Sequence, residues 1–212
     1  MKNIIIFLIK SIMAGMMIAI GGTVFLMSDN KVIGASFFTI GLFMIVTRGL
    51  NLYTGKVGYI FENNPKYLIE VLVTIIGNFI GTFLVGFILK FTRIFETINA
   101  KAISICDAKL NDNIISIIFL SIMCGMLMYL AVNGFRDGKD NVAKYASVFL
   151  SVIVFILCGF EHSIANMYYF TVAGWSLHAF GYLGLMVLGN GIGGVIVPLT
   201  EKLRKKLGEK IA

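Results

Sequence analysis

Two short stretches decide how this chain is built: residues 11–16 read SIMAGM, and residues 121–126 read SIMCGM, 110 positions later. A second pair of stretches also matches, GNFIG at residues 77–81 and GNGIG at residues 189–193, at an interval of 112. Order and interval agree between the two pairs. We therefore interpret the sequence as two copies of one unit.

Both copies are strongly apolar. The 212 residues are 58% hydrophobic and only 14% charged, and the mean hydropathy is +0.90, whereas soluble domains carry about 25% charged residues. The polar stretches are too short to fold alone. The sequence therefore predicts one transmembrane domain over residues 1–212, with the copies at about 4–100 and 113–200.

Crossing a bilayer as a helix takes about 20 apolar residues. Apolar runs of at least this length predict six spans, at residues 4–27, 33–61, 67–90, 113–134, 145–172 and 179–198. The first run is too long for a signal peptide and lacks a small-residue cleavage end, so we interpret it as a helix of the domain. The second and fifth runs are too long for one span, and each contains polar residues.

Three spans in each copy are an odd number, so the second copy must enter the membrane from the opposite side. The predicted fold class is therefore an all-α integral membrane protein of six transmembrane helices, arranged as two inverted three-helix repeats. In such folds the solute path runs where broken helices meet near the bilayer midplane. The polar positions predict breaks at residues 50–56 and 160–166.

Basic residues favour one orientation. Twelve of the eighteen lysines and arginines lie on the face with the two termini, and five lie on the opposite face. The positive-inside rule then predicts cytoplasmic termini, with a basic tail at residues 201–212 that faces anionic lipid rather than nucleic acid. The three cysteines lack metal-ligand spacing, and we expect no metal site and no cofactor.

Glu161 and His162 are the most informative polar pair, because ionisable groups at membrane depth normally face a cavity or a partner. We interpret His162 as a pathway residue rather than as part of a polar cap of the half-helices, since imidazole can change charge near neutral pH. For Glu161 and Asn166 the favoured interpretation is a polar cap that satisfies freed backbone groups, and a place in the pathway is the alternative. Thr54, at the matching break, can offer a hydroxyl from the opposite side.

Residues 159–167, GFEHSIANM, resemble the signature of the formate/nitrite transporter family, and residues 51–55, NLYTG, resemble the loop that interrupts that family's second helix. The resemblance implies an aquaporin-like protomer with broken second and fifth helices. It also implies a homopentamer with one pore in each subunit, and transport of small monovalent anions such as formate, nitrite or hydrosulfide.

Site roles follow from this resemblance. It implies that His162 is the central histidine of the pore and that Thr54 is the threonine opposite it. It also implies that Lys109 raises the positive potential where an anion approaches the pore. On spacing alone, Lys109 is a solvated lysine at a helix end. The apolar constrictions implied by the resemblance are Phe38, Leu52, Tyr53 and Phe155.

The predicted function is therefore a cell-membrane channel or transporter for small monovalent anions, coupled to protons through His162. The alternatives are an aquaporin-like channel for neutral solutes and a membrane enzyme. Ser163 beside His162 makes no nucleophile–base pair, because adjacent helical residues do not face each other, so we expect no enzyme. Basic Arg48 and Lys56 depart from the commoner formate-type pattern and leave the substrate open.

Overall fold

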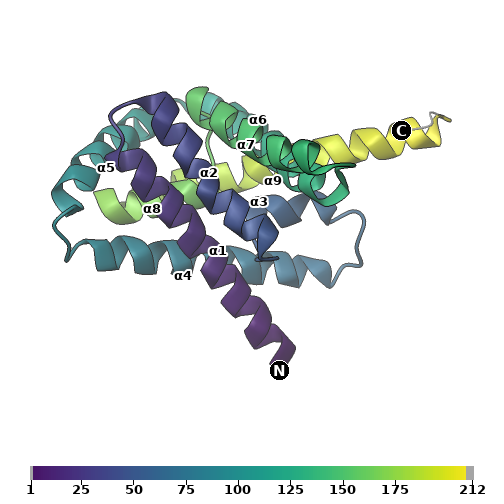
Figure 1. The fold of residues 1–212 in the computed structure, drawn as a ribbon, viewed down its shortest axis with the longest axis horizontal. Helices are drawn as coiled ribbons and strands as arrows, with labels where there is room; N and C mark the ends of the chain where they lie inside the picture. The colour runs from purple at the N-terminus through teal and green to yellow at the C-terminus, as the bar shows by residue number, and fades with distance from the viewer. Residues whose placement is uncertain (1, 209–212) are drawn as a thin grey trace.

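The computed structural model describes residues 2–208, and every regular element in that range is a helix (Figure 1). The all-helical prediction is therefore confirmed for the described chain. The elements are α1 Lys2–Met27, α2 Lys31–Thr47, α3 Tyr53–Lys56, the short 3-10 helix η1 Val57–Tyr59, α4 Tyr67–Leu89, α5 Phe95–Leu110, α6 Ile114–Asp137, α7 Asn141–Leu157, α8 Ser163–Ala173 and α9 Leu177–Lys206. The end of the predicted basic tail, with Lys210, lies outside the described residues.

Among the described residues, α1, α4, α6 and α9 are long and apolar enough to cross a membrane. α2 and α7 are apolar but have only 17 residues each. In both runs that the sequence marked as too long, the helix is interrupted and continues as a separate short helix, α3 after α2 and α8 after α7. α9 runs past Pro198 to Lys206, so the first part of the basic tail extends the last apolar helix.

α5 is a helix that the sequence analysis did not predict. Its residues fall between the third and fourth predicted spans, and they are too polar for the 20-residue apolar template. The helix buries Ile98, Ala102 and Cys106, and the side-chain amide of Asn99 donates to the Val172 carbonyl of α8 at 2.8 Å. α5 therefore packs beside the second broken helix.

The two interruptions begin with the same helix ending. Gly49 and Gly159 take the left-handed conformation, at φ of 60° and 70°. The next amide then reaches back over the last turn, from Leu50 N to Ile45 O and from Phe160 N to Phe155 O, each at 2.9 Å. This is the Schellman ending that glycine favours, and it turns both chains out of the helix at matching positions.

Close helix contacts hold the frame of each half. α1 packs on α4 and α6 packs on α9, and α1 crosses α4 in Figure 1. A Cβ atom added to Gly81 would overlap the Ile12 carbonyl oxygen, and one added to Gly193 would overlap the Ile122 carbonyl oxygen. Small residues at such crossings let helix backbones approach closely, so the repeated glycines have the same packing role in both halves.

A buried asparagine bridges each break to the neighbouring helices. The Asn78 amide donates to Ser11 O at 2.7 Å and to Asn51 O at 2.9 Å, and its oxygen accepts from Tyr53 N at 2.9 Å. The Asn51 carbonyl and the Tyr53 amide, which lie in the break, therefore gain a partner that water would otherwise supply.

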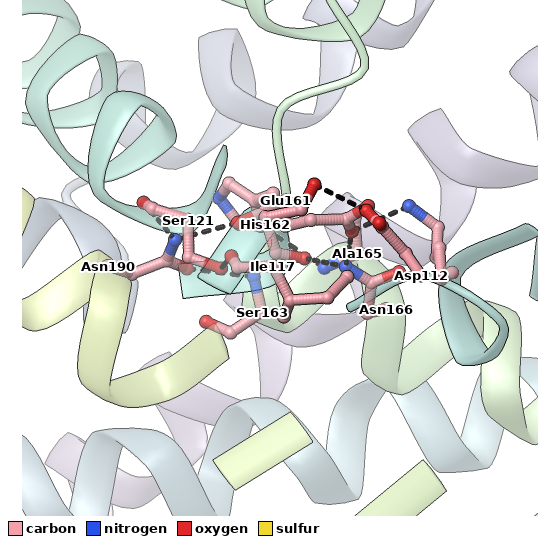
Figure 2. Close-up of polar contacts among 11 residues, drawn as sticks. Asp112, Ile117, Ser121, Glu161, His162, Ser163, Ala165, Asn166 and Asn190 are labelled. Atoms are coloured by element: carbon pink, nitrogen blue, oxygen red, sulfur yellow. Dashed lines mark hydrogen bonds and ion pairs between the residues drawn. The ribbon is translucent and has the colours of Figure 1, made fainter. Parts of the chain in front are cut away.

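Asn190 repeats this arrangement in the second half. Its amide donates to Ser121 O at 2.8 Å and to Glu161 O at 2.7 Å, and its oxygen accepts from Ser163 N at 2.8 Å (Figure 2). Because the two asparagines hold equivalent backbone groups, the break positions depend on them.

We predict that Asn190→Leu destabilises the protein, because an apolar side chain of similar size leaves the Ser163 amide and the Glu161 carbonyl without the partner that Asn190 supplies. The expected loss is about 2 kcal/mol or more, measured as a lower midpoint of thermal unfolding in detergent. Asn141→Ala, at an exposed position, is the control and should leave the midpoint unchanged. An unchanged midpoint for Asn190→Leu would show that the bridge is dispensable.

Candidate functional site

His162 and Thr54 meet in the protein interior. The Nε2 atom of His162 lies 3.1 Å from Oγ1 of Thr54, and the two residues are 2% and 0% exposed. Thr54 lies on α3 and His162 directly precedes α8, so each side chain comes from one of the two breaks. The convergence of the two breaks on one polar contact is what positions this pair.

His162 is also the N-cap of α8. Its Nδ1 atom accepts a hydrogen bond from the Ala165 amide at 3.1 Å (Figure 2). An imidazole nitrogen that accepts carries no proton, so the ring in this arrangement is neutral and bears its hydrogen on Nε2. Nε2–H therefore donates toward Thr54, and a second proton on Nδ1 would remove the cap.

Apolar side chains surround this pair. The Phe155 ring stacks on the imidazole with ring centroids 5.5 Å apart, and Phe38 packs edge-on against Phe155 at 5.8 Å. Leu52, buried like these rings, precedes α3. The Tyr53 hydroxyl donates to Val187 O of α9 at 2.8 Å, which turns this predicted constriction residue toward a helix contact.

Two cavities lie on either side of the pair. The Leu52 cavity, of about 370 Å³, is lined by Leu52 and Gly55. In the sequence these two residues directly precede and follow Tyr53 and Thr54. The Phe155 cavity, of about 310 Å³, is lined by Phe155 and by Glu161, the neighbour of His162.

The ends of α6 place the two cavities relative to the helices. Arg136, in the last turn of α6, lines the Leu52 cavity, and Asp112, just before α6 begins, lines the Phe155 cavity. A helix of 24 residues is about 36 Å long, so the cavities lie at opposite ends of a helix that is long enough to cross a membrane. The His162–Thr54 pair lies between them.

Lys109 and Glu161 form a buried ion pair at the Phe155 cavity. The Lys109 ammonium is 2.6 Å from Oε2 of Glu161, and their side chains are 14% and 4% exposed. The Asn166 amide donates to the same oxygen at 2.8 Å and to His162 O at 3.1 Å. The carboxylate therefore links α5 to the first turn of α8.

The structure brings five of the predicted pathway residues into two contacts. His162 meets Thr54, and Lys109, Glu161 and Asn166 share one carboxylate oxygen. The expected cap of the half-helix is made by the His162 ring rather than by Glu161 or Asn166. Lys109 lies against a carboxylate, which differs from the free lysine that spacing alone suggested.

The bridging roles of Asn78 and Asn190 were not predicted from the sequence. A signal for them was present, because each is an amide side chain inside an apolar run and follows the first glycine of a repeated stretch. Lys31 was also missed as a lining residue of the Phe155 cavity, and its ammonium donates to Leu157 O at 3.1 Å.

Comparison with known proteins identifies the family. Residues 2–201 match the family model described as formate/nitrite transporter. The formate channel FocB of Escherichia coli (strain K12) is 25% identical over 174 residues, which cover 73% of this chain and 62% of that protein. The formate-nitrite transporter of Plasmodium falciparum (isolate 3D7) is 25% identical over 202 residues, covering 78% and 64%. In these two comparisons the matched part is less than two thirds of the curated relative.

Solved structures share the fold. A pentameric formate channel with formate bound superposes with a TM-score of 0.81 at 22% identity, over 97% of this chain and 98% of that chain. A channel described as an FNT family ion channel gives a TM-score of 0.83 at 22% identity, over 96% and 91%. The resemblance of residues 159–167 and 51–55 is confirmed: the chain belongs to the formate/nitrite transporter family, whose members are channels and transporters and not enzymes.

Proposed function

We propose that this protein is a membrane pore for small monovalent anions, with formate, nitrite and hydrosulfide as the candidate substrates. The observation that carries the proposal is the buried His162–Thr54 contact between two cavities at opposite ends of a long apolar helix. The names of the relatives, formate channel and formate-nitrite transporter, support the substrate class.

An anion reaching the pair would exchange its water for two hydrogen bonds. It would part the Nε2–Oγ1 contact and accept from the His162 Nε2–H and the Thr54 hydroxyl. Apolar Phe38, Leu52 and Phe155 around the pair would strip hydrating water, and Tyr53, bonded to α9, would support the wall beside them. Removing water from an anion is costly unless donors replace it, so these donors determine the barrier.

Proton coupling would lower the barrier further. In its cationic form the His162 ring would transfer the Nε2 proton to the bound anion, which leaves a neutral imidazole and a neutral acid that crosses without charge. The cationic form needs a proton on Nδ1, and this proton breaks the bond from the Ala165 amide. Losing this bond makes the cationic ring unfavourable, and the charge of a bound anion would offset that loss. The His162 ring would therefore become charged chiefly when an anion lies beside it.

The Lys109–Glu161 pair would form the polar mouth of the Phe155 cavity. Because the carboxylate lies at 2.6 Å, it offsets the Lys109 charge at short range, and the positive potential would come from Lys109 and Lys31 together. Asn166 would hold Glu161 in place. A channel for neutral solutes, the alternative function, has no need of an ion pair beside a titratable ring.

We also propose the architecture that the duplicated contacts favour: one domain of six membrane-crossing segments, built as two inverted repeats. Both described ends of the chain lie toward the Leu52 cavity, since Asn51 bonds to Phe7 O in α1 and Arg136 shares a further cavity with Lys205 of α9. With the basic residues on that face, both termini would be cytoplasmic in the cell membrane. The pentameric neighbour supports a homopentamer.

Substitution of His162 tests the function. Anion flux into proteoliposomes is measured for formate, nitrite and hydrosulfide at acidic and neutral pH, with urea as the neutral solute. His162→Leu can neither donate nor titrate, and we expect its anion flux to fall about tenfold or more, as the loss of one buried hydrogen bond to a charge implies. His162→Asn can donate and cap but cannot titrate.

The two variants separate the routes. Flux retained in His162→Asn with a lost pH dependence indicates passage as the anion, and flux lost in both variants indicates proton transfer through the ring. Anion flux and pH dependence unchanged in both would contradict the proposed role of His162. Urea flux equal to or above anion flux would favour the neutral-solute channel.

A second prediction concerns the ion pair. Lys109→Met leaves the Glu161 carboxylate buried without its cation, so we expect a loss of roughly 3 to 5 kcal/mol of stability. Lys109→Met combined with Glu161→Gln should recover most of it, as measured by thermal unfolding in detergent. A double variant no more stable than Lys109→Met alone would show that the ion pair does not control stability. Anion flux through the folded double variant then reports what the charges of the pair contribute to transport.

A further inference from the structure

The Leu52 cavity has an unbalanced lining charge. Of the described residues that line it, Lys56 and Arg136 are cationic and none carries a carboxylate. The Phe155 cavity differs, because its lining cations are accompanied by Asp112 and Glu161. The proposed mechanism does not use Lys56 or Arg136.

Lys56 is held at the cavity wall with its charge only loosely paired. Its ammonium lies over the rings of Phe7 and Tyr67, at 4.9 and 5.2 Å from their centroids. Its carboxylate partner, Glu70, is 3.7 Å away and 50% exposed. Lys109 has its partner at 2.6 Å and nearly buried, so the exposed Glu70 offsets its lysine much less, since water screens exposed charges.

Arg136 faces the same cavity from α6. Its guanidinium lies over the Tyr59 ring at 4.4 Å from the centroid, and Tyr59 also lines the cavity. Arg136 forms an exposed ion pair with Asp137, through Nε at 2.8 Å and Nη2 at 3.0 Å, and water screens this pair. Nη2 also donates to Oδ1 of Asn133. Among residues 2–208 these bonds leave the Nη1 amino group for a ligand, and the guanidinium lies over the Tyr59 ring.

The cavity is large enough for a hydrated ion. Its volume is about 370 Å³, and a water molecule takes about 30 Å³ in the liquid. Leu52, at its inner end, is apolar and buried, so an anion must exchange water for other partners before it passes that residue. Cations at the wall of a low-dielectric cleft raise the local concentration of anions.

We propose that Lys56 and Arg136 form an anion-binding site in the Leu52 cavity, at which a small monovalent anion waits before it passes Leu52. Glu70 sets the affinity of this site, because it competes with the anion for the Lys56 ammonium. The site rests on the proposed anion transport for its role, but its ligand chemistry depends only on the two cations.

Binding is tested without transport. Crystals of the detergent-purified protein are soaked in bromide, and anomalous scattering locates the bound ions. A bromide peak in contact with Lys56 and Arg136, absent in Lys56→Gln, supports the site. A peak that is equally strong in Lys56→Gln, or no peak at these residues in the unmodified protein, overturns it.

Flux tests the role of the site. Formate influx is measured over a range of concentrations in proteoliposomes, from the side that carries the Leu52 cavity. We expect Lys56→Gln to raise the half-saturating concentration roughly three- to tenfold, and Glu70→Gln to lower it. Lys66→Gln removes an exposed lysine outside the cavity lining and should leave it unchanged. Lys56→Arg keeps the charge and should retain most of the affinity.

Opposite shifts in Lys56→Gln and Glu70→Gln distinguish a binding site from a structural ion pair, since breaking a structural pair from either side changes flux in the same direction. Shifts in the same direction, or an unchanged value in Lys56→Gln, would overturn the staging role. Bromide bound at these residues in a protein that transports no anion would overturn the proposed function while supporting the site.

Discussion

The constraint on which this structure depends is that backbone groups freed inside a lipid-facing bundle must find partners without water. A broken helix leaves amides and carbonyls unpaired, and each costs several kcal/mol in hydrocarbon. Asn78 and Asn190 each meet that requirement for one carbonyl and one amide of a break, and each donates a third hydrogen bond to a carbonyl of a neighbouring helix. Gly49 and Gly159 end the preceding helices at matching positions. The polar contact at the centre of the protein exists because both breaks are stabilised in this way.

Much of this frame was predictable from the sequence. The repeated stretches at residues 11–16 and 121–126, and the polar positions inside two long apolar runs, placed both breaks within a few residues of where α2 and α7 end. These signals are local patterns, and the physical requirement behind them is local as well: a polar residue at membrane depth needs a partner or a cavity.

The remaining features depend on contacts between distant parts of the chain. Lys109 and Glu161 are 52 positions apart, and neither the spacing nor the composition indicates that they meet. α5, which carries Lys109, has too few apolar residues for a membrane template, although it packs on α8. The cap by His162 was the less favoured interpretation of that residue, and imidazole is an uncommon N-cap, since the usual side chains are Ser, Thr, Asp and Asn.

The two breaks share a backbone but differ in side chains, and this difference carries the chemistry. Leu52 and His162 occupy equivalent positions before α3 and α8, yet only His162 caps its helix with a side chain. Asn51 and Glu161 also occupy equivalent positions. The backbone N–H of Asn51 donates to Lys10 O, and the backbone N–H of Glu161 donates to Leu120 O. Asn78 and Asn190 bind the backbone carbonyls of Asn51 and Glu161, so these two hydrogen bonds do not involve the side chains at those positions.

Charge can therefore change at these positions while the backbone contacts persist, provided that each new charge gains a partner. Glu161 meets this condition through Lys109 and Asn166, whereas neutral Asn51 needs only the Phe7 carbonyl. The cavity beside Glu161 accordingly has charged lining residues of both signs, whereas the charged lining residues described for the cavity beside Asn51 are both cations. A duplicated frame thus presents two electrostatically different cavities on either side of one buried histidine.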